Sequence, residues 1–350
     1  MAYTTISNPT EYFNTVLYSG TGSEASITGL NHEPGLVWFK KRSATEHHFI
    51  YDQLRGALKK IAPSNANAES TETQTLKSFD SDGFTLGTSA EVNGGSTTYV
   101  AWSWKGGSSN TSISASGSGD GYINAATVRA NPTSGISIVQ YTGANSQISN
   151  YQHTKLTHGL GAKPDMIWTK ETGGSDDWIV GLTTYNDGHL HFNSTDARSG
   201  ADFTGNWNTS DATHFSLGND SKLNNNGDTY IAYIFKAIRG YSSFGEWTGN
   251  GSSDGNFIYT GFRPAFVLFK DRANNGANWV IHDDKRDTSN PVDTVLKPSA
   301  TDAESTSTFA DFVANGFKVR ANFGTGSTFI YAAFAAAPLI GSNGVPANAT

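Results

Sequence analysis

Two histidines in the stretch GHLHF have a spacing that could bring two imidazoles to one metal ion. His189 and His191 lie two positions apart, so in a strand both side chains point to the same face. A zinc site needs a further ligand from elsewhere. The chain consists of three similar segments, described below, and the other two segments contain no matching histidine pair. We therefore predict strand histidines that face solvent and no metal site. His48 aligns with Trp178 and Trp279 and is interpreted as a packing residue.

Carboxylates stand close together at three places, which raises the question of a glycosidase. Such an enzyme holds two carboxylates roughly 5–10 Å apart across a cleft. No pair recurs in all three related segments, and SDG before a strand is typical of a turn. The sequence also lacks the serine elbow, the phosphate-binding glycine loop and the calcium-loop spacing of other classes. We predict no catalytic residue and no cofactor; the pairs are Asp80/Asp82, Asp176/Asp177 and Asp283/Asp284.

Aromatic side chains remain as candidates for ligand binding, since an exposed ring can stack on a sugar. The chain contains 8 Trp, 14 Tyr and 20 Phe, more than small β-sandwich cores usually need. Trp38 and Trp168 alternate with apolar neighbours, so each either completes a core or forms a stacking platform. Trp207 and Trp247 stand beside Asn and Gly, which favours exposed contacts. These four tryptophans are the predicted ligand-binding residues, with core packing as the main alternative for the first two.

The strands that must position these residues recur along the chain. A proline followed six positions later by a lysine occurs in EPGLVWFKK (33–41), KPDMIWTKE (163–171) and RPAFVLFKD (263–271). A second phrase follows at a nearly constant distance, in TYVAWSWKG, TYIAYIFKA and TFIYAAFAA. Two phrases in register three times indicate three copies of one unit of about 95–100 residues.

Within each copy the pattern predicts which residues are buried. Residues 36–39 form a strand that is apolar on both faces, and Lys40 marks its emergence into water. Arg55 and Arg286, together with the phrases NAES and DAES, occur only in copies one and three. The aromatic residues at repeated positions are predicted to be core; they are Trp104, Phe235, Phe334, Phe84, Phe215 and Phe317.

Short strands bounded by Gly, Asn, Ser and Asp favour an all-β fold. We predict three tandem antiparallel β-sandwich repeats of jelly-roll or concanavalin-like type. The stretch 51–61 is the best candidate for a helical turn. The predicted segments are a first repeat (1–105), a Gly/Ser linker or long surface loop (106–121), a second repeat (122–238), a third repeat (239–337) and a polar C-terminal tail (338–350).

The bulk composition of the 350 residues excludes several classes of protein. The net charge is −7, which argues against nucleic acid as a partner, because binding to phosphates needs a basic face. The chain has no cysteine, so disulfides and thiol chemistry are excluded. No apolar run is long enough for membrane insertion, and the first residues lack a secretion signal. Release by cell lysis, as part of a virus particle, would fit.

Several of these stretches together resemble virion structural proteins of tailed phages that infect marine bacteria, of the tail-fibre or appendage type. The likeness covers nearly the whole chain, and copy two departs most from it, with TYNDGHLHFNSTDARSG in place of the Arg-Gly stretch. The matching stretches are MAYTTI, YFNTVLYSGTG, PGLVWFKKRSATEHHFIYDQLRGA, FDSDGFTLG, TYVAWSWKGG, FGEWTGNGSSDGNFIYTGFRPAFVLFKD and NGFKVR.

The resemblance implies a β fold on the surface of a virion and no established catalytic residues. We therefore expect a non-enzymatic structural protein, a tail fibre or appendage that contacts host-surface glycans. The expected partners are other virion proteins and further copies of the chain, with a trimer as the expected oligomer. A capsid decoration protein is the alternative, and a glycan depolymerase is the third possibility.

Overall fold

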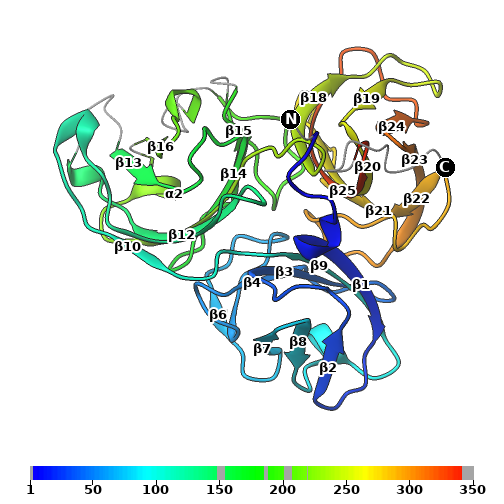
Figure 1. Cartoon of the computed structure of the whole chain (residues 1–350), viewed down its shortest axis with the longest axis horizontal. Helices are drawn as coiled ribbons and strands as arrows, with labels where there is room; N and C mark the ends of the chain where they lie inside the picture. Colours follow the sequence, from blue (N-terminus) through cyan, green and yellow to red (C-terminus); the bar gives the residue numbers. More distant parts are fainter. Residues whose placement is uncertain (1–2, 148–153, 185–187, 201–206, 219, 341–350) are drawn as a thin grey trace.

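The computed structural model describes residues 3–147, 154–184, 188–200, 207–218 and 220–340. Its named strands pair in antiparallel sheets, and Figure 1 shows three lobes that surround a common centre. We call residues 13–104 lobe 1, residues 111–235 lobe 2 and residues 242–338 lobe 3. The all-β class predicted from the sequence is confirmed.

In lobe 1 a four-stranded sheet of order β1-β9-β3-β4 borders the centre of the molecule. A three-stranded sheet, β2-β8-β7, packs on its other face, and β5 pairs with β6. A 3₁₀ helix, η1 (Pro9–Glu11), precedes the lobe. The elements of lobe 1 are β1 (Phe13–Ser19), β2 (Ala25–Thr28), β3 (Leu36–Lys41), β4 (Phe49–Asp52), β5 (Lys59–Lys60), β6 (Ser70–Thr71), β7 (Leu76–Asp80), β8 (Gly83–Leu86), the short helix α1 (Ala90–Asn93) and β9 (Thr98–Trp104).

Lobe 2 contains a six-stranded sheet of order β10-β11-β12-β17-β14-β15 and a two-stranded sheet, β13-β16. The segment 106–121, expected to be a linker or surface loop, contributes strand β10 at the edge of the larger sheet, where it pairs with β11. The elements of lobe 2 are β10 (Thr111–Ile113), η2 (Gly119–Gly121), β11 (Ala126–Asn131), β12 (Ile136–Thr142), η3 (Asn145–Gln147), β13 (Thr154–Thr157), β14 (Met166–Glu171), β15 (Ile179–Leu182), η4 (Trp207–Thr209), β16 (His214–Leu217), the short helix α2 (Ser221–Asn224) and β17 (Thr229–Phe235).

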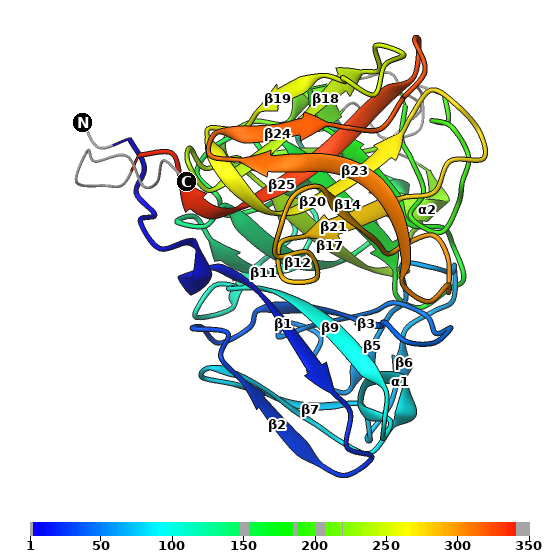
Figure 2. The same cartoon turned by 90° about the vertical axis from the view of Figure 1, so that its right-hand side faces the viewer.

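Lobe 3 has two four-stranded sheets, of order β18-β25-β20-β21 and β19-β24-β23-β22. In Figure 2 the second sheet lies over β25 and β20. Most of the predicted tail, residues 341–350, lies outside the described residues. The strands are β18 (Ser242–Thr248), β19 (Phe257–Tyr259), β20 (Phe262–Asp271), β21 (Val280–Asp283), β22 (Val292–Val295), β23 (Ser305–Val313), β24 (Gly316–Val319) and β25 (Thr328–Pro338).

The same four-strand order recurs at the centre of every lobe, as β1-β9-β3-β4, β12-β17-β14-β15 and β18-β25-β20-β21. The two recurrent phrases therefore pair with each other in each lobe. The strand register places Trp38 opposite Trp102, Trp168 opposite Tyr233 and Leu268 opposite Ala332. These six positions, two in each lobe, are equivalent.

The central sheets are buried on both faces, which explains why their strands read as continuous apolar runs. One face contributes to a core shared by all three lobes, and the other packs inside its own lobe. In the shared core the Trp38 ring lies 5.9 Å from Trp168, and Trp104 lies 5.5 Å from Phe334. The core positions predicted from the repeat are confirmed as buried.

Candidate functional site

The four tryptophans predicted to bind a ligand are all buried. Trp38 and Trp168 lie in the shared core with no exposed surface, so the core interpretation of these two is confirmed. Trp207 is 1% exposed inside lobe 2, and Trp247 is 6% exposed inside lobe 3. A sugar cannot stack on a ring whose faces are covered by protein. The expectation of exposed contacts at Trp207 and Trp247 is corrected accordingly.

The histidine pair comes together as its spacing suggested, but the His191 side chain is only 16% exposed and His189 is buried. The Nε2 atoms of His189 and His191 lie 3.2 Å apart, and His189 is only 2% exposed. Burial, with the nearby His191 and Lys222, lowers the pKa of His189 to about 3. The carboxylate beside the pair, Asp177, lies 3.9 Å from His191 Nδ1 and accepts a bond from Lys222. Among the described residues no three His, Cys, Asp or Glu side chains are grouped to hold a metal ion.

The carboxylate pairs hold the backbone and neighbouring side chains in place. Asp82 accepts hydrogen bonds from the backbone N–H groups of Gly29 and Asn31, and Asp80 accepts from Ser78 and Thr85. Asp82 lies in the turn that the SDG pattern indicated, and Asp80 is the last residue of β7.

Asp283 belongs to a buried ion pair. Its Oδ2 accepts from Arg286 Nε and from Trp102 Nε1, the latter at 3.0 Å. Arg286 also bonds Glu304, whose carboxylate is in turn held by both Nε and Nη2 of Arg42 at 2.8 Å. Since Trp102 and Arg42 belong to lobe 1, this network joins lobe 3 to lobe 1.

An equivalent network joins lobe 1 to lobe 2. Asp52 Oδ2 accepts from Arg55 at 2.6 Å and from the Tyr233 hydroxyl at 2.7 Å, and Arg55 reaches Glu69 at 3.0 Å. Burial by itself lowers the pKa of Arg55, but Asp52, Tyr233 and Glu69 outweigh it, so the pKa is raised. The Asp-Arg pair and the phrase NAES or DAES occur only in copies one and three. These residues therefore mark the contact between lobes 1 and 2 and the contact between lobes 3 and 1 in the sequence.

The third contact, between lobes 2 and 3, is apolar at the same place. The register puts Leu182 at the position of Asp52 and Asp283. Ala332 stands where the other lobes have Trp102 or Tyr233. Both Leu182 and Ala332 lie in the shared core. The acidic group and its polar aromatic partner are thus replaced together, which avoids a buried carboxylate without a donor.

A second set of bonds joins neighbouring lobes in the same direction at two of the three contacts. The Trp178 indole donates to the Ala62 carbonyl of lobe 1 at 2.9 Å, and the Trp279 indole donates to the His191 carbonyl of lobe 2 at 2.7 Å. The third position is occupied by His48, whose Nδ1 accepts from Trp38 Nε1 in its own lobe and whose Nε2 has no hydrogen-bond partner. The strand bridges next to these carbonyls make the three positions equivalent.

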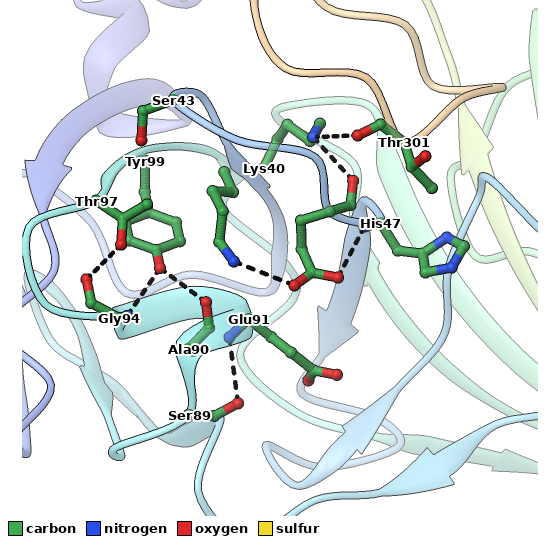
Figure 3. A network of polar contacts seen from close by, with 12 residues as sticks. Lys40, Ser43, His47, Ser89, Ala90, Glu91, Gly94, Thr97, Tyr99 and Thr301 are labelled. Carbon is green, nitrogen blue, oxygen red and sulfur yellow. Dashed lines mark hydrogen bonds and ion pairs between the residues drawn. The ribbon is translucent and has the colours of Figure 1, made fainter.

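Two of the three recurrent lysines, Lys40 and Lys270, also belong to these contacts, which corrects the expectation that Lys40 emerges into water. Lys40 is 1% exposed, and Lys170 and Lys270 are fully buried. Burial lowers the pKa of each to about 8. Lys40 Nζ donates to the carbonyl of Thr301 in lobe 3 at 3.2 Å, as Figure 3 shows, and Lys270 donates to Thr195 in lobe 2. We call the three contacts between neighbouring lobes (lobe 1 with lobe 2, lobe 2 with lobe 3, and lobe 3 with lobe 1) the seams.

Two exposed aromatic residues were missed by the sequence reasoning. Phe257 and Tyr259 lie on the edge strand β19, 47% and 57% exposed, on either side of the buried Ile258. The alternation in FIY carried the signal, since one face of a short edge strand faces water. No helix in the described part of the chain is long and apolar enough to cross a membrane.

The three lobes with their interlocking seams define an all-β protein in which one chain closes a ring around a shared core. The model of a family described as a domain of unknown function, DUF7483, matches residues 8–338. The chain therefore belongs to that family. No curated protein and no solved structure matches it.

Proposed function

We propose that this chain is a non-enzymatic structural protein of a phage particle, a tail fibre or other appendage that contacts host-surface glycans. The observation that carries the proposal is the closed ring of seams around one core. Such a ring holds the three similar lobes together as one rigid unit, which suits a subunit of an assembled particle. The sequence resemblance supplies the setting at the virion surface, with release by lysis of the host cell.

Within this proposal the lobes are three tandem β-sandwich repeats. The recurrence of the central strand order, of the paired phrases and of the directional seam bonds supports one unit used three times. Each unit contacts the next in a head-to-tail manner, the type of contact that closes a ring when the rotation fits. Three units of one chain close this ring.

The polar groups within the described residues support a structural role over a catalytic one. Asp52 and Asp283 each accept a bond from an aromatic side chain of a neighbouring lobe, and Lys40 and Lys270 each donate to a backbone carbonyl of a neighbouring lobe. An enzyme needs titratable groups turned towards a substrate, whereas these groups face neighbouring lobes. Weak glycan contacts repeated along assembled copies would gain strength by avidity.

Electron cryo-microscopy of the intact particle tests the proposal. We expect the three-lobed density on the tail or an appendage. In a separate assay, we expect the chain to bind host glycans without cleaving them. Release of reducing ends from those glycans would instead support the depolymerase, and absence of the chain from the particle would overturn the virion assignment. Light scattering of the purified chain tests the proposed trimer.

A capsid decoration protein is the second candidate, favoured by the threefold arrangement of the lobes. A block with three similar faces matches the threefold positions of a capsid lattice. Density over such positions on the head, with no glycan binding, would support this candidate over the tail appendage.

A further inference from the structure

Lobe 3 contains a cavity at a place where the other two lobes are filled. Its volume is about 420 Å³, within the range of small-molecule sites. Aromatic rings on the inner side of the lobe form much of its wall, and polar residues of the loops and of β23 complete it. The residues used below are Asp271, His282, Lys297, Ala321 and Phe323.

A missing helix accounts for the space. In lobes 1 and 2 the eleven residues before the last strand (87–97 and 218–228) include α1 and α2. These helices bury Val92 and Leu223 in the cores of their lobes. The corresponding segment of lobe 3 has only eight residues, 320–327, and no helix. The partly buried Phe323 packs against Trp247 and Phe329 there.

The tyrosines that hold the helix are replaced in lobe 3 as well. Figure 3 shows the Tyr99 oxygen bonded to the ends of α1, donating to Ala90 and accepting from Gly94. Its stacked neighbour Tyr18 donates to the Val92 carbonyl. Lobe 2 repeats this arrangement with Tyr230 and Tyr141 around α2.

At the equivalent positions lobe 3 has Phe329 and Trp247, stacked 4.8 Å apart and without hydroxyl groups. The helix and all the hydroxyls that bond it are therefore absent together. The cavity follows from a coordinated set of residues, not from one poorly packed side chain.

A buried polar atom without a partner lies in the wall. His282 is 1% exposed, and its Nδ1 atom has no hydrogen-bond partner. Burial and the charge of Arg286 keep the pKa of His282 well below its usual value, while the Thr294 backbone acts in the opposite direction. The ring is therefore neutral, and its unpartnered Nδ1 can accept a hydrogen bond in the tautomer that carries the proton on Nε2.

In lobe 1 the residue equivalent to His282 has a larger side chain, and in lobe 2 another ring covers the equivalent position. The register aligns it with Tyr51 in lobe 1 and Gly181 in lobe 2. Tyr51 is fully buried, and the Trp207 ring packs over Gly181. The imidazole in lobe 3 is smaller than the Tyr51 side chain, and one of its nitrogen atoms is buried without a hydrogen-bond partner.

We propose that this cavity binds one neutral sugar residue of a glycan. The partly buried Phe323 ring suits the C–H face of a sugar ring, and His282 Nδ1 can accept a hydroxyl hydrogen. The two charges in the wall have opposite signs, on Asp271 and Lys297, so a charged ligand would gain no net attraction. The ligand class rests on the proposed glycan contact, while the location rests on the cavity itself.

The test is saturation-transfer NMR with the methyl glycosides of glucose, galactose, mannose and N-acetylglucosamine at millimolar concentration. We expect transfer to at least one of them. Ala321→Trp fills the cavity and should abolish that transfer. Thr88→Trp is the matched control, at the equivalent position of lobe 1, and should leave it unchanged.

His282→Phe keeps a ring but removes the acceptor, and should weaken binding about threefold to tenfold. Thermal melting verifies that each variant folds. No transfer to any glycoside, or equal transfer in wild type, Ala321→Trp and His282→Phe, would overturn the sugar site. Binding of the chain to host glycans that these two variants leave intact would reject the cavity and keep the proposed function.

Discussion

At the level of one residue, Asp284 is a largely buried acidic side chain. Its carboxylate follows the buried Asp283, and its nearest ion-pair partner, Arg263, lies 3.9 Å away. One carboxylate oxygen has no hydrogen-bond partner. Burial is the main reason that the pKa of Asp284 rises to about 6, with the charge of Asp283 acting in the same direction.

Asp284→Asn is expected to stabilise the protein at pH 7. Because the folded-state pKa is raised, the folded protein binds more protons than the unfolded chain between pH 4 and 6, so stability falls as pH rises through that window. Removing the charge should increase the free energy of unfolding by about 1–3 kcal/mol at pH 7 and by much less at pH 4. Urea unfolding at both pH values measures this.

Asp302→Asn serves as the control for Asp284→Asn, because the Asp302 side chain is 58% exposed. It should change stability little at either pH. A loss of stability in Asp284→Asn at pH 7 would contradict the assignment of Asp284 as a destabilising charge.

At the level of elements, the seams show two solutions for the same position. Two seams use a buried Asp-Arg pair with an aromatic donor, and the third uses Leu182 and Ala332. A buried ion pair contributes little by comparison with apolar packing, but removing one partner is costly. The chain contains both solutions, so one can be exchanged for the other.

Arg55→Met should destabilise the protein by about 3–5 kcal/mol, because Asp52 is then buried without its cation. The double variant Asp52→Leu, Arg55→Met should recover part of this loss, since it imitates Leu182 in lobe 2. Equilibrium denaturation of both variants measures the difference. Lys77→Met, which breaks an exposed ion pair with Glu24, is the control and should cost about 0–1 kcal/mol. Equal destabilisation by Arg55→Met and Lys77→Met would disprove the role of the seam.

Tyr99→Phe tests the attachment of α1 to its sheet. The variant removes the hydroxyl that bonds Ala90 and Gly94 and leaves a buried backbone N–H unpaired, so we expect a loss of about 1–3 kcal/mol. Thermal or urea unfolding measures it, with Tyr259→Phe at an exposed hydroxyl as the control. If Tyr99→Phe were as stable as that control, the hydroxyl would not anchor the helix.

On the scale of the whole molecule, the shared core makes the three lobes interdependent. A separated lobe would expose the face that carries Trp38, Trp168 or Phe266 to water, and exposed apolar surface of this kind favours association or unfolding. The lobes differ in this respect from independent domains joined by linkers.

We expect a single cooperative unfolding transition for the whole chain. Differential scanning calorimetry should give equal calorimetric and van't Hoff enthalpies. A fragment of residues 1–105 should not fold to a stable monomer. Three separate transitions, or a folded fragment, would show that the lobes are independent.

Sequence alone predicted the strands and the cores well, because burial on both faces leaves a clear pattern around Leu36–Phe39. It could not place Lys40, since the carbonyl that the amine reaches comes from Thr301, far along the chain. Alternation also cannot distinguish a face buried inside a lobe from one buried between lobes, so the common centre was not foreseen. The helix-capping residues Ser89 and Asp220 were readable signals for α1 and α2. The helical turn suggested at 51–61 is wrong, because this stretch contains the end of β4, two turns and β5.

The covalent joining of the lobes has a consequence for how this ring can vary. In a ring of three identical subunits, any substitution appears at three places at once, so a change useful at one place must be tolerated at the other two. Here each lobe is encoded separately, so lobe 3 can lack the helix that lobes 1 and 2 contain. A single chain can therefore devote two lobes to stability and leave the third free to acquire a specialised pocket.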